Sequence, residues 1–392
     1  MSFTIHSPTK IIFGQPASEG LRGELPAVVP CLCKGAVRGQ RILLVSDPIL
    51  AELPWVHTVQ AALVDAGHVV TLFSDVSSNP SSKEVNEGLQ LAQDERVRAI
   101  VALGGGSVID LAKVIAMLLA NGGAYADYVD NHRSIERRSR FLVAIPTTAG
   151  SGSEVTRSAM IVDGTQPGRK VLESPLMCAH VALIDPELTR SLPPPATATT
   201  GMNAFVQALE AYIGRQANPF ADPLAVNAMQ TVWSFLPRAF AAGDDMTARN
   251  AMMLAALWGG LCRDQAGTGL IDALSGPLTA HLNLHHGLAN ALLLPHVMRF
   301  NLPAIPPVRR QRLSRTLGLA PDAGDEQILE RLTQFVHYVG LPTRLEELGI
   351  TVSDYDWHGI ADEATQATAV ANNPRDVSAA DCQAILLAGL MG

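Results

Sequence analysis

The sequence predicts an α/β domain with a parallel sheet over residues 1–194, followed by an all-α domain over residues 195–392. In the first half, short continuous apolar runs alternate with helical patterns, which is typical of a parallel sheet covered on both faces. The pattern changes at residues 191–195 (Ser-Leu-Pro-Pro-Pro), and beyond them almost every segment has helical periodicity.

The elements of the first domain follow from these runs. Residues 9–13 form a short edge strand ending at Gly14, and residues 26–40 form a loop insertion whose Cys31 and Cys33 lack the spacing of a metal knuckle. The other predicted strands are residues 41–46, 69–73, 99–103, 141–145 and 181–184, and the predicted helices are residues 56–66, 83–93 and 110–119.

The second domain is predicted from apolar residues that recur every three or four positions. The predicted helices are residues 197–214, 223–241, 245–261, 272–281, 287–299, 325–339 and 379–390.

Two of the predicted strands lead directly into turns of small residues. Residues 99–103 precede Gly104, Gly105, Gly106 and Ser107, with Asp110 one helical turn later, and residues 141–145 precede a second turn whose hydroxyl-bearing residues include Thr147, Thr148 and Ser151. Glycines allow close approach of a ligand, and the first amides of a helix are unpaired, so each turn can hold a phosphate. Two such turns on neighbouring strands predict a pyrophosphate site and therefore a dinucleotide-binding domain.

Asp47 follows the first long strand of this domain. A carboxylate there can accept a hydrogen bond from a ribose 2′-hydroxyl and would repel a 2′-phosphate. The sequence therefore favours NAD over NADP, unless Asp47 is an ordinary turn residue before Pro48.

Composition excludes several classes of partner. The chain has a net charge of −8 with no basic run, which argues against nucleic acid and anionic membranes. Its five scattered cysteines fit a reducing compartment, and it begins with no signal-peptide pattern. No apolar stretch reaches the roughly 18 residues that span a bilayer. We therefore expect a cytoplasmic protein acting on a small molecule.

Six stretches of the chain carry recognisable motifs: residues 104–110, 146–156, 185–189, 191–194, 201–202 and 286–298. In these motifs and in their order, the chain resembles the iron-containing (group III) alcohol dehydrogenase family. The resemblance implies the dehydroquinate synthase-like fold, with an N-terminal dinucleotide domain, a C-terminal helical domain and an active site in the cleft between them. It also implies a homodimer or larger homo-oligomer.

The family also implies a metal site, and here the sequence departs from it. Family members hold Fe²⁺ or Zn²⁺ with one Asp and three His, and the matching positions are Asn203, Gln207, Asp272 and His286. A further family His near the nicotinamide is Gly276 here. Two neutral amides are poor ligands for either metal, so Fe or Zn binding is doubtful, although Asp272 and His286 could hold a divalent ion loosely.

Catalysis without a metal needs another source of positive charge or a proton for the substrate oxygen. The best candidate is His286 as an imidazolium, with Asn203 and Gln207 as amide donors. His281 and His285 lie close in sequence and could replace the missing acid by a local shift. Two arginines are candidates for binding a substrate carboxylate, Arg263 and Arg169, the latter where the family usually has a Lys near the cofactor.

We expect an NAD(H)-dependent oxidoreductase that interconverts a small alcohol and its aldehyde or ketone by hydride transfer, with a degenerate metal site. One alternative is a metal-independent keto-acid reductase of the maleylacetate reductase type, whose Gly-Met-Asn-Ala stretch resembles residues 201–204. An alternative of another class is a nucleotide-binding pseudoenzyme. A dehydroquinate synthase-like lyase would need a Glu/His/His metal set, which the sequence does not offer.

Overall fold

The structure is a computed structural model that describes residues 3–14, 39–129, 132–162 and 169–391. The predicted loop insertion at 26–40, with Cys31 and Cys33, lies almost entirely outside these residues. Contacts divide the chain into two compact units. The α/β unit comprises His6–Thr148 and Gly152–Arg190, and the helical unit comprises Met1–Ile5, Ala149–Ser151 and Ser191–Gly392. The domain boundary at residue 194 stays a prediction.

The α/β unit is built on a six-stranded sheet in the order β1-β8-β5-β4-β2-β3, and every pair of neighbours is parallel. This confirms the predicted fold class, and β1 lies at an edge as predicted. The strands are β1 (Lys10–Phe13), β2 (Arg41–Val45), β3 (Val69–Phe73), β4 (Ala99–Gly104), β5 (Phe141–Pro146) and β8 (Val181–Ile184).

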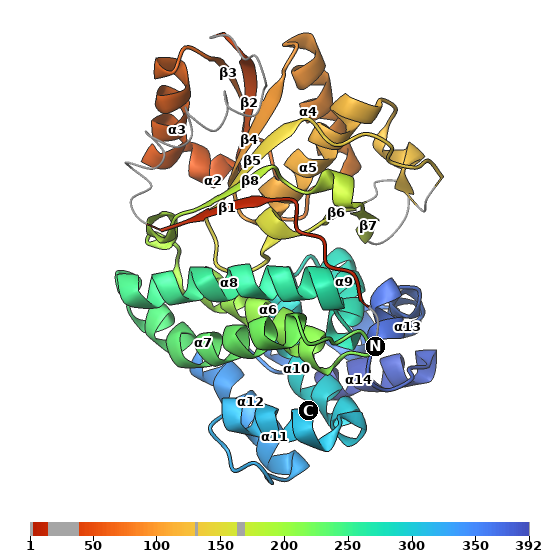
Figure 1. Ribbon diagram of the computed structural model, residues 1–392. Helices are drawn as coiled ribbons and strands as arrows, with labels where there is room; N and C mark the ends of the chain where they lie inside the picture. The colour runs from red at the N-terminus through yellow and green to blue at the C-terminus, as the bar shows by residue number, and fades with distance from the viewer. Residues whose placement is uncertain (1–2, 15–38, 130–131, 163–168, 392) are drawn as a thin grey trace. The chain divides into compact units, whose positions relative to one another are not determined.

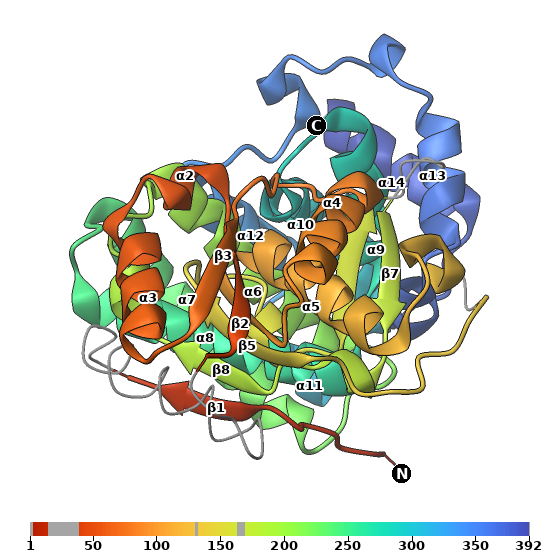
Figure 2. The same cartoon turned by 90° about the horizontal axis from the view of Figure 1, so that it is seen from above.

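Helices cover both faces of this sheet, which explains why its central strands are apolar on every residue. Helix α3 (Pro54–Asp65) packs against one face through Val56, Val59 and Leu63. Helices α4 (Ser82–Asp94) and α5 (Gly106–Asn121) pack against the other. Figure 2 shows α3 on one side of β2 and β3 and α4 and α5 on the other. A short helix, α2 (Pro48–Ala51), follows β2 and begins the connection to β3.

An antiparallel hairpin of β6 (Ser158–Val162) and β7 (Arg169–Glu173) forms a second, two-stranded sheet that the sequence analysis did not assign. Residues along β6 alternate between buried and half-buried, because only one face of the ribbon packs against the unit. Such short alternating runs give a weaker signal than the continuous apolar strands of the main sheet.

The helical unit is organised around α6 (Pro194–Ile213), whose residues from Thr197 to Ile213 are all buried. Figure 1 shows α7 and α8 beside it. The other helices are α7 (Ala221–Ala241), α8 (Met246–Ala266), α9 (Leu270–Leu282), α10 (His286–Asn301), α11 (Pro307–Thr316), α12 (Asp325–Tyr338), α13 (Trp357–Thr365) and α14 (Ala379–Met391). None of the helices within the described residues is long and apolar enough to cross a membrane.

Two of these helices, α11 and α13, were not predicted. Helix α11 carries four arginines in ten residues and buries only Leu313, Ser314 and Thr316, so it lacks the apolar stripe that marks a helix in sequence.

Candidate functional site

The two glycine- and hydroxyl-rich turns begin at neighbouring points of the sheet. Strands β4 and β5 pair in register, with Gly104 opposite Pro146, and the amide of Thr147 donates to the carbonyl oxygen of Gly104 at 3.1 Å. The prediction that the two strands are neighbours is therefore confirmed.

The first turn has little room for side chains at its first two positions, and least at Gly104. A Cβ on Gly104 would lie 2.5 Å from Val108 Cγ2, and one on Gly105 would lie 3.3 Å from Thr148 Cγ2. Gly105 is the N-cap of α5, which starts at Gly106. The first amides of this long helix therefore have no acceptor within the helix, and a phosphate could accept hydrogen bonds from them.

The remaining residues predicted to bind the cofactor differ in their hydrogen-bond partners and in the unit to which they belong. Ser107 Oγ donates to the carbonyl oxygen of Ser78. Asp110 is buried and accepts from Ser153 Oγ (2.8 Å) and the Met160 amide (3.0 Å), so it links α5 to β6 and to the segment that precedes this strand. Asp47 caps α2 by accepting from the Leu50 amide, and burial raises its pKa. Ser151 belongs to the helical unit. Their roles toward a cofactor stay predictions.

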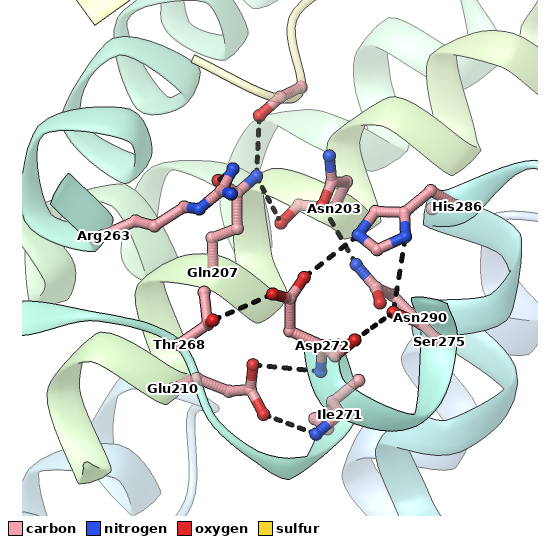
Figure 3. Close-up of polar contacts among 12 residues, drawn as sticks. Asn203, Gln207, Glu210, Arg263, Thr268, Ile271, Asp272, Ser275, His286 and Asn290 are labelled. Atoms are coloured by element: carbon pink, nitrogen blue, oxygen red, sulfur yellow. Dashed lines mark hydrogen bonds and ion pairs between the residues drawn. The ribbon is translucent and has the colours of Figure 1, made fainter. Parts of the chain in front are cut away.

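In the helical unit, four helices bring the predicted catalytic residues together. Asn203 and Gln207 lie one turn apart on α6, Asp272 comes from α9, His286 from α10, and Arg263 from the last turn of α8. Figure 3 shows their polar groups in one cluster.

The amides of this cluster are held by specific partners. Asn203 Oδ1 accepts from Asn290 Nδ2 at 2.9 Å. Gln207 Nε2 donates to the carbonyl oxygens of Gly150 and Asn203, each at 3.2 Å, and its Oε1 accepts from Arg263 Nη1 at 3.3 Å. Both amide oxygens that stand at metal-ligand positions therefore already accept hydrogen bonds.

His286 bridges Asp272 and Ser275. Its Nε2 lies 3.1 Å from Asp272 Oδ1, and its Nδ1 lies 3.3 Å from Ser275 Oγ. Ser275 Oγ also donates to the Asp272 carbonyl oxygen at 3.0 Å. A carboxylate only accepts, so Nε2 carries a proton and donates to Asp272. A hydroxyl can accept from Nδ1 or donate to it, so the neutral ring and the imidazolium both fit this arrangement.

Asp272 is the anion of the cluster. Burial alone would raise its pKa, but the hydrogen bond and charge of His286, the charge of Arg263 and a hydrogen bond from Thr268 together hold the pKa well below its usual range. The carboxylate is therefore ionised.

Glu210 and Asn290 belong to the same region and were missed. Glu210 is buried and accepts from the amides of Ile271 and Asp272, which caps the start of α9. Burial, with the nearby Asp272 charge, raises its pKa to about 8 against these hydrogen bonds. The sequence did contain a signal for Glu210, because positions 203, 207 and 210 share one stripe of α6 and the other residues from 201 to 213 are hydrophobic or glycine.

The other residues considered for this site in the sequence analysis are His281, His285, Gly276 and Arg169. His281 pairs with Glu363 of α13 at 2.8 Å, and His285 Nδ1 accepts from the Gly287 amide at the start of α10. A Cβ on Gly276 would meet nothing within 4 Å, so this position is open where the family has a His. The side chain of Arg169 lies outside the described part of the chain.

The residues present do not fit Fe²⁺ or Zn²⁺. Two of the four positions offer amide oxygens that already accept hydrogen bonds, and the other two, Asp272 and His286, are hydrogen-bonded to each other. Among the described residues, no group of three or more His, Cys, Asp or Glu could hold a metal ion.

We predict that Asp272→Asn lowers the free energy of unfolding by about 2–3 kcal/mol at neutral pH, because a charged hydrogen-bonding partner is lost. The folded pKa of Asp272 is below its unfolded value, so its contribution is present above that unfolded value of about 3.9 and is lost as the pH falls below it. Urea unfolding of the unsubstituted protein and of Asp272→Asn at several pH values measures this contribution. The difference between their free energies of unfolding should narrow below about pH 4. A difference in free energy that grows on acidification would contradict the prediction.

Comparisons with known proteins identify the family of this chain. Residues 8–186 match the family described as iron-containing alcohol dehydrogenase, and residues 197–390 match the C-terminal part of the Fe-containing alcohol dehydrogenase family. The chain is 32% identical over 379 residues to an NAD-dependent methanol dehydrogenase of Bacillus methanolicus, covering 95% of this chain and 98% of that protein. It is 36% identical over 332 residues to a 4-hydroxybutyrate dehydrogenase of Cupriavidus necator, covering 82% and 85%.

Solved structures give the same result. A crystal structure of a 1,3-propanediol oxidoreductase superposes with a TM-score of 0.91 at 30% identity, covering all of both chains. A sulfoacetaldehyde reductase from Bifidobacterium kashiwanohense, solved with NAD⁺, superposes with a TM-score of 0.87 at 26% identity, covering 100% of this chain and 99% of that one. Since both halves of the chain match and the relatives align over most of their length, the protein belongs to the iron-containing alcohol dehydrogenase family of oxidoreductases.

Proposed function

We propose that this protein interconverts a small alcohol and its aldehyde or ketone with NAD(H), without a tightly bound Fe or Zn ion. The observation that carries the proposal is the hydrogen-bonded cluster of Asn203, Gln207, Asp272 and His286, which has the family's positions and a different chemistry. A cytoplasmic homodimer or larger homo-oligomer remains part of the proposal.

Bound NADH supplies the hydride that reduces the carbonyl carbon. As an imidazolium stabilised by Asp272, His286 gives a proton to the carbonyl oxygen once the ring turns its Nε2–H from Asp272 to the substrate. Asn203 Nδ2, which has no partner among the described residues and in Figure 3 points away from Asn290, can donate to the same oxygen. In the direction of alcohol oxidation, neutral His286 accepts the proton.

The relatives support the cofactor and the substrate class. One is named as an NAD-dependent methanol dehydrogenase, another as a 4-hydroxybutyrate dehydrogenase, and a structural neighbour was solved with NAD⁺. These names describe enzymes that act on small alcohols or aldehydes, which is the class that we propose here.

The test combines metal analysis with turnover. The protein is prepared with Fe²⁺ or Zn²⁺ present, dialysed, and analysed for metal, and NADH oxidation is then followed with aldehydes, ketones and keto-acids. We expect turnover with substoichiometric metal and no loss of rate on chelation. Stoichiometric Fe or Zn that chelation removes together with activity would contradict the proposal, and tight NADH binding without any turnover would favour a pseudoenzyme.

A keto-acid reductase is the second candidate, and the observation that favours it is Arg263, a guanidinium inside the cluster. A guanidinium binds carboxylates with two parallel hydrogen bonds. In the same substrate panel, a strong preference for carbonyl compounds that carry a carboxylate over neutral ones of equal length would select this candidate.

Asp47→Ser tests the proposed preference for NAD. Serine also caps helices, so the bond to the Leu50 amide can be kept while the charge is removed. We expect the ratio of kcat/KM for NADPH to that for NADH to rise about tenfold or more, because the 2′-phosphate no longer meets a carboxylate. Asp47→Ala should shift the ratio equally but with a lower Tm. An unchanged ratio in both variants would contradict the role of Asp47.

A further inference from the structure

We propose that the Arg263 guanidinium takes the place of the family's divalent cation as the fixed positive charge that faces the substrate oxygen. This rests on the proposed function and deepens it, since it names the group that replaces the metal. The proton donor of the reaction remains His286.

The cluster is built to hold a guanidinium. Arg263 is half-buried in the last turn of α8, and its Nη1 donates to Gln207 Oε1 at 3.3 Å. Gln207 is itself fully buried and is fixed through Nε2 by the carbonyl oxygens of Gly150 and Asn203. The amide therefore presents only its oxygen toward α8. We assign Gln207 as the positioning residue for Arg263.

The exchange of ligand types is consistent with this assignment. Where the family has an imidazole at 207, which offers a metal one lone pair, this chain has an amide oxygen, which accepts from a cation's N–H. The family has its carboxylate at position 203, whereas this chain has it at position 272. Asp272 lies close enough to Arg263 that the guanidinium lowers the pKa of Asp272. This chain therefore differs from the family both in the cation of the site and in the position of the carboxylate.

A guanidinium suits the role chemically. It is charged at every working pH and offers a planar set of N–H donors, so it can stabilise the oxyanion that forms as hydride reaches the carbonyl carbon. A divalent ion bound beside it would be repelled by the like charge. Arg263 and a bound metal are therefore alternatives at this site.

The experiment compares Arg263→Ala, Arg263→Lys and the surface control Arg238→Ala, whose guanidinium pairs with Asp245 on the exposed side of the same unit. We expect Arg263→Ala to lower kcat with a neutral aldehyde about a hundredfold to a thousandfold, with the Kd of NADH unchanged. Arg263→Lys should retain an intermediate rate, because it keeps the charge but loses the planar donors. Arg238→Ala should behave as the unsubstituted protein.

Two readouts separate transition-state stabilisation from a structural role. Guanidinium chloride at low millimolar concentration should restore part of the rate of Arg263→Ala and leave Arg238→Ala unchanged. The kinetic isotope effect with 4-deuterated NADH should rise in Arg263→Ala, since hydride transfer becomes slower relative to product release. Circular dichroism and Tm check that each variant is folded.

Three outcomes would overturn the inference. In the first, Arg263→Ala raises KM only for substrates with a carboxylate and leaves kcat for neutral aldehydes unchanged, which makes Arg263 a substrate anchor while the proposed function stands. In the second, the loss of kcat is not rescued by guanidinium and the isotope effect does not change. In the third, the unsubstituted protein turns over no carbonyl compound, and then the proposed function fails as well.

Discussion

Replacing His286 by alanine should lower kcat for carbonyl reduction by about a hundredfold to ten-thousandfold, the range that a positioned general acid contributes. The ring lies between Asp272 and Ser275, and we propose it as the proton donor of the cluster. Stopped-flow measurement of NADH oxidation under single-turnover conditions reports the chemical step directly, separated from product release.

His286→Gln sharpens this experiment, because glutamine can keep a hydrogen bond to Asp272 but cannot transfer a proton. It should be as impaired as His286→Ala, although more stable. His358→Ala is the matched control, since that ring lies exposed and pairs with Asp362 one turn away. If His286→Gln retained most of the rate, His286 would orient the cluster and another group would supply the proton.

Restoring the family's ligands should convert this cluster into a metal site. The triple variant Asn203→Asp, Gln207→His, Asp272→His, together with the existing His286, offers one carboxylate and three imidazoles, the set that suits Fe²⁺ and Zn²⁺. Zn²⁺ at a thousand times its Kd would stabilise the folded protein by about 4 kcal/mol, which a thermal melt detects readily. The unsubstituted protein should show no such shift.

The matched control adds His286→Ala to the triple variant and should remove the Zn²⁺ effect. Adding Arg263→Ala instead should strengthen Zn²⁺ binding, because a like charge leaves the site. Equal Zn²⁺ stabilisation of the unsubstituted protein and the triple variant would contradict the view that the present residues are unsuited to the metal. The double variant Asn203→Asp, Gln207→His serves if the triple variant does not fold.

The architecture was largely predictable because its signals are local. The apolar strands β2 to β5 are bounded by glycines and polar turns, so their patterns locate them to within a residue or two, and burial on both faces implies parallel pairing. The hairpin β6–β7 and helix α11 were missed for the opposite reason, since an edge ribbon and a polar surface helix have short or weak apolar patterns.

The positions of the candidate site were predictable in part. Helical spacing alone places Asn203 and Gln207 on one face of α6, and the resemblance to the family located Asp272 and His286. The partners of these residues were not predictable, because Asn290, Glu210 and Ser275 contact them across different helices. No spacing rule connects α6 to α10.

The sequence by itself determined the parallel sheet, the two small-residue turns on neighbouring strands and the loss of the family's ligand types at 203, 207 and 272. Each is a matter of residue type and spacing along one segment. Only the tertiary structure decided that Asp272 pairs with His286, that Gln207 holds Arg263, and that both amide oxygens already accept hydrogen bonds. The physical reason is that hydrogen-bond direction and the balance of buried charge depend on which helices meet, and helix packing is set by contacts between residues far apart in the chain.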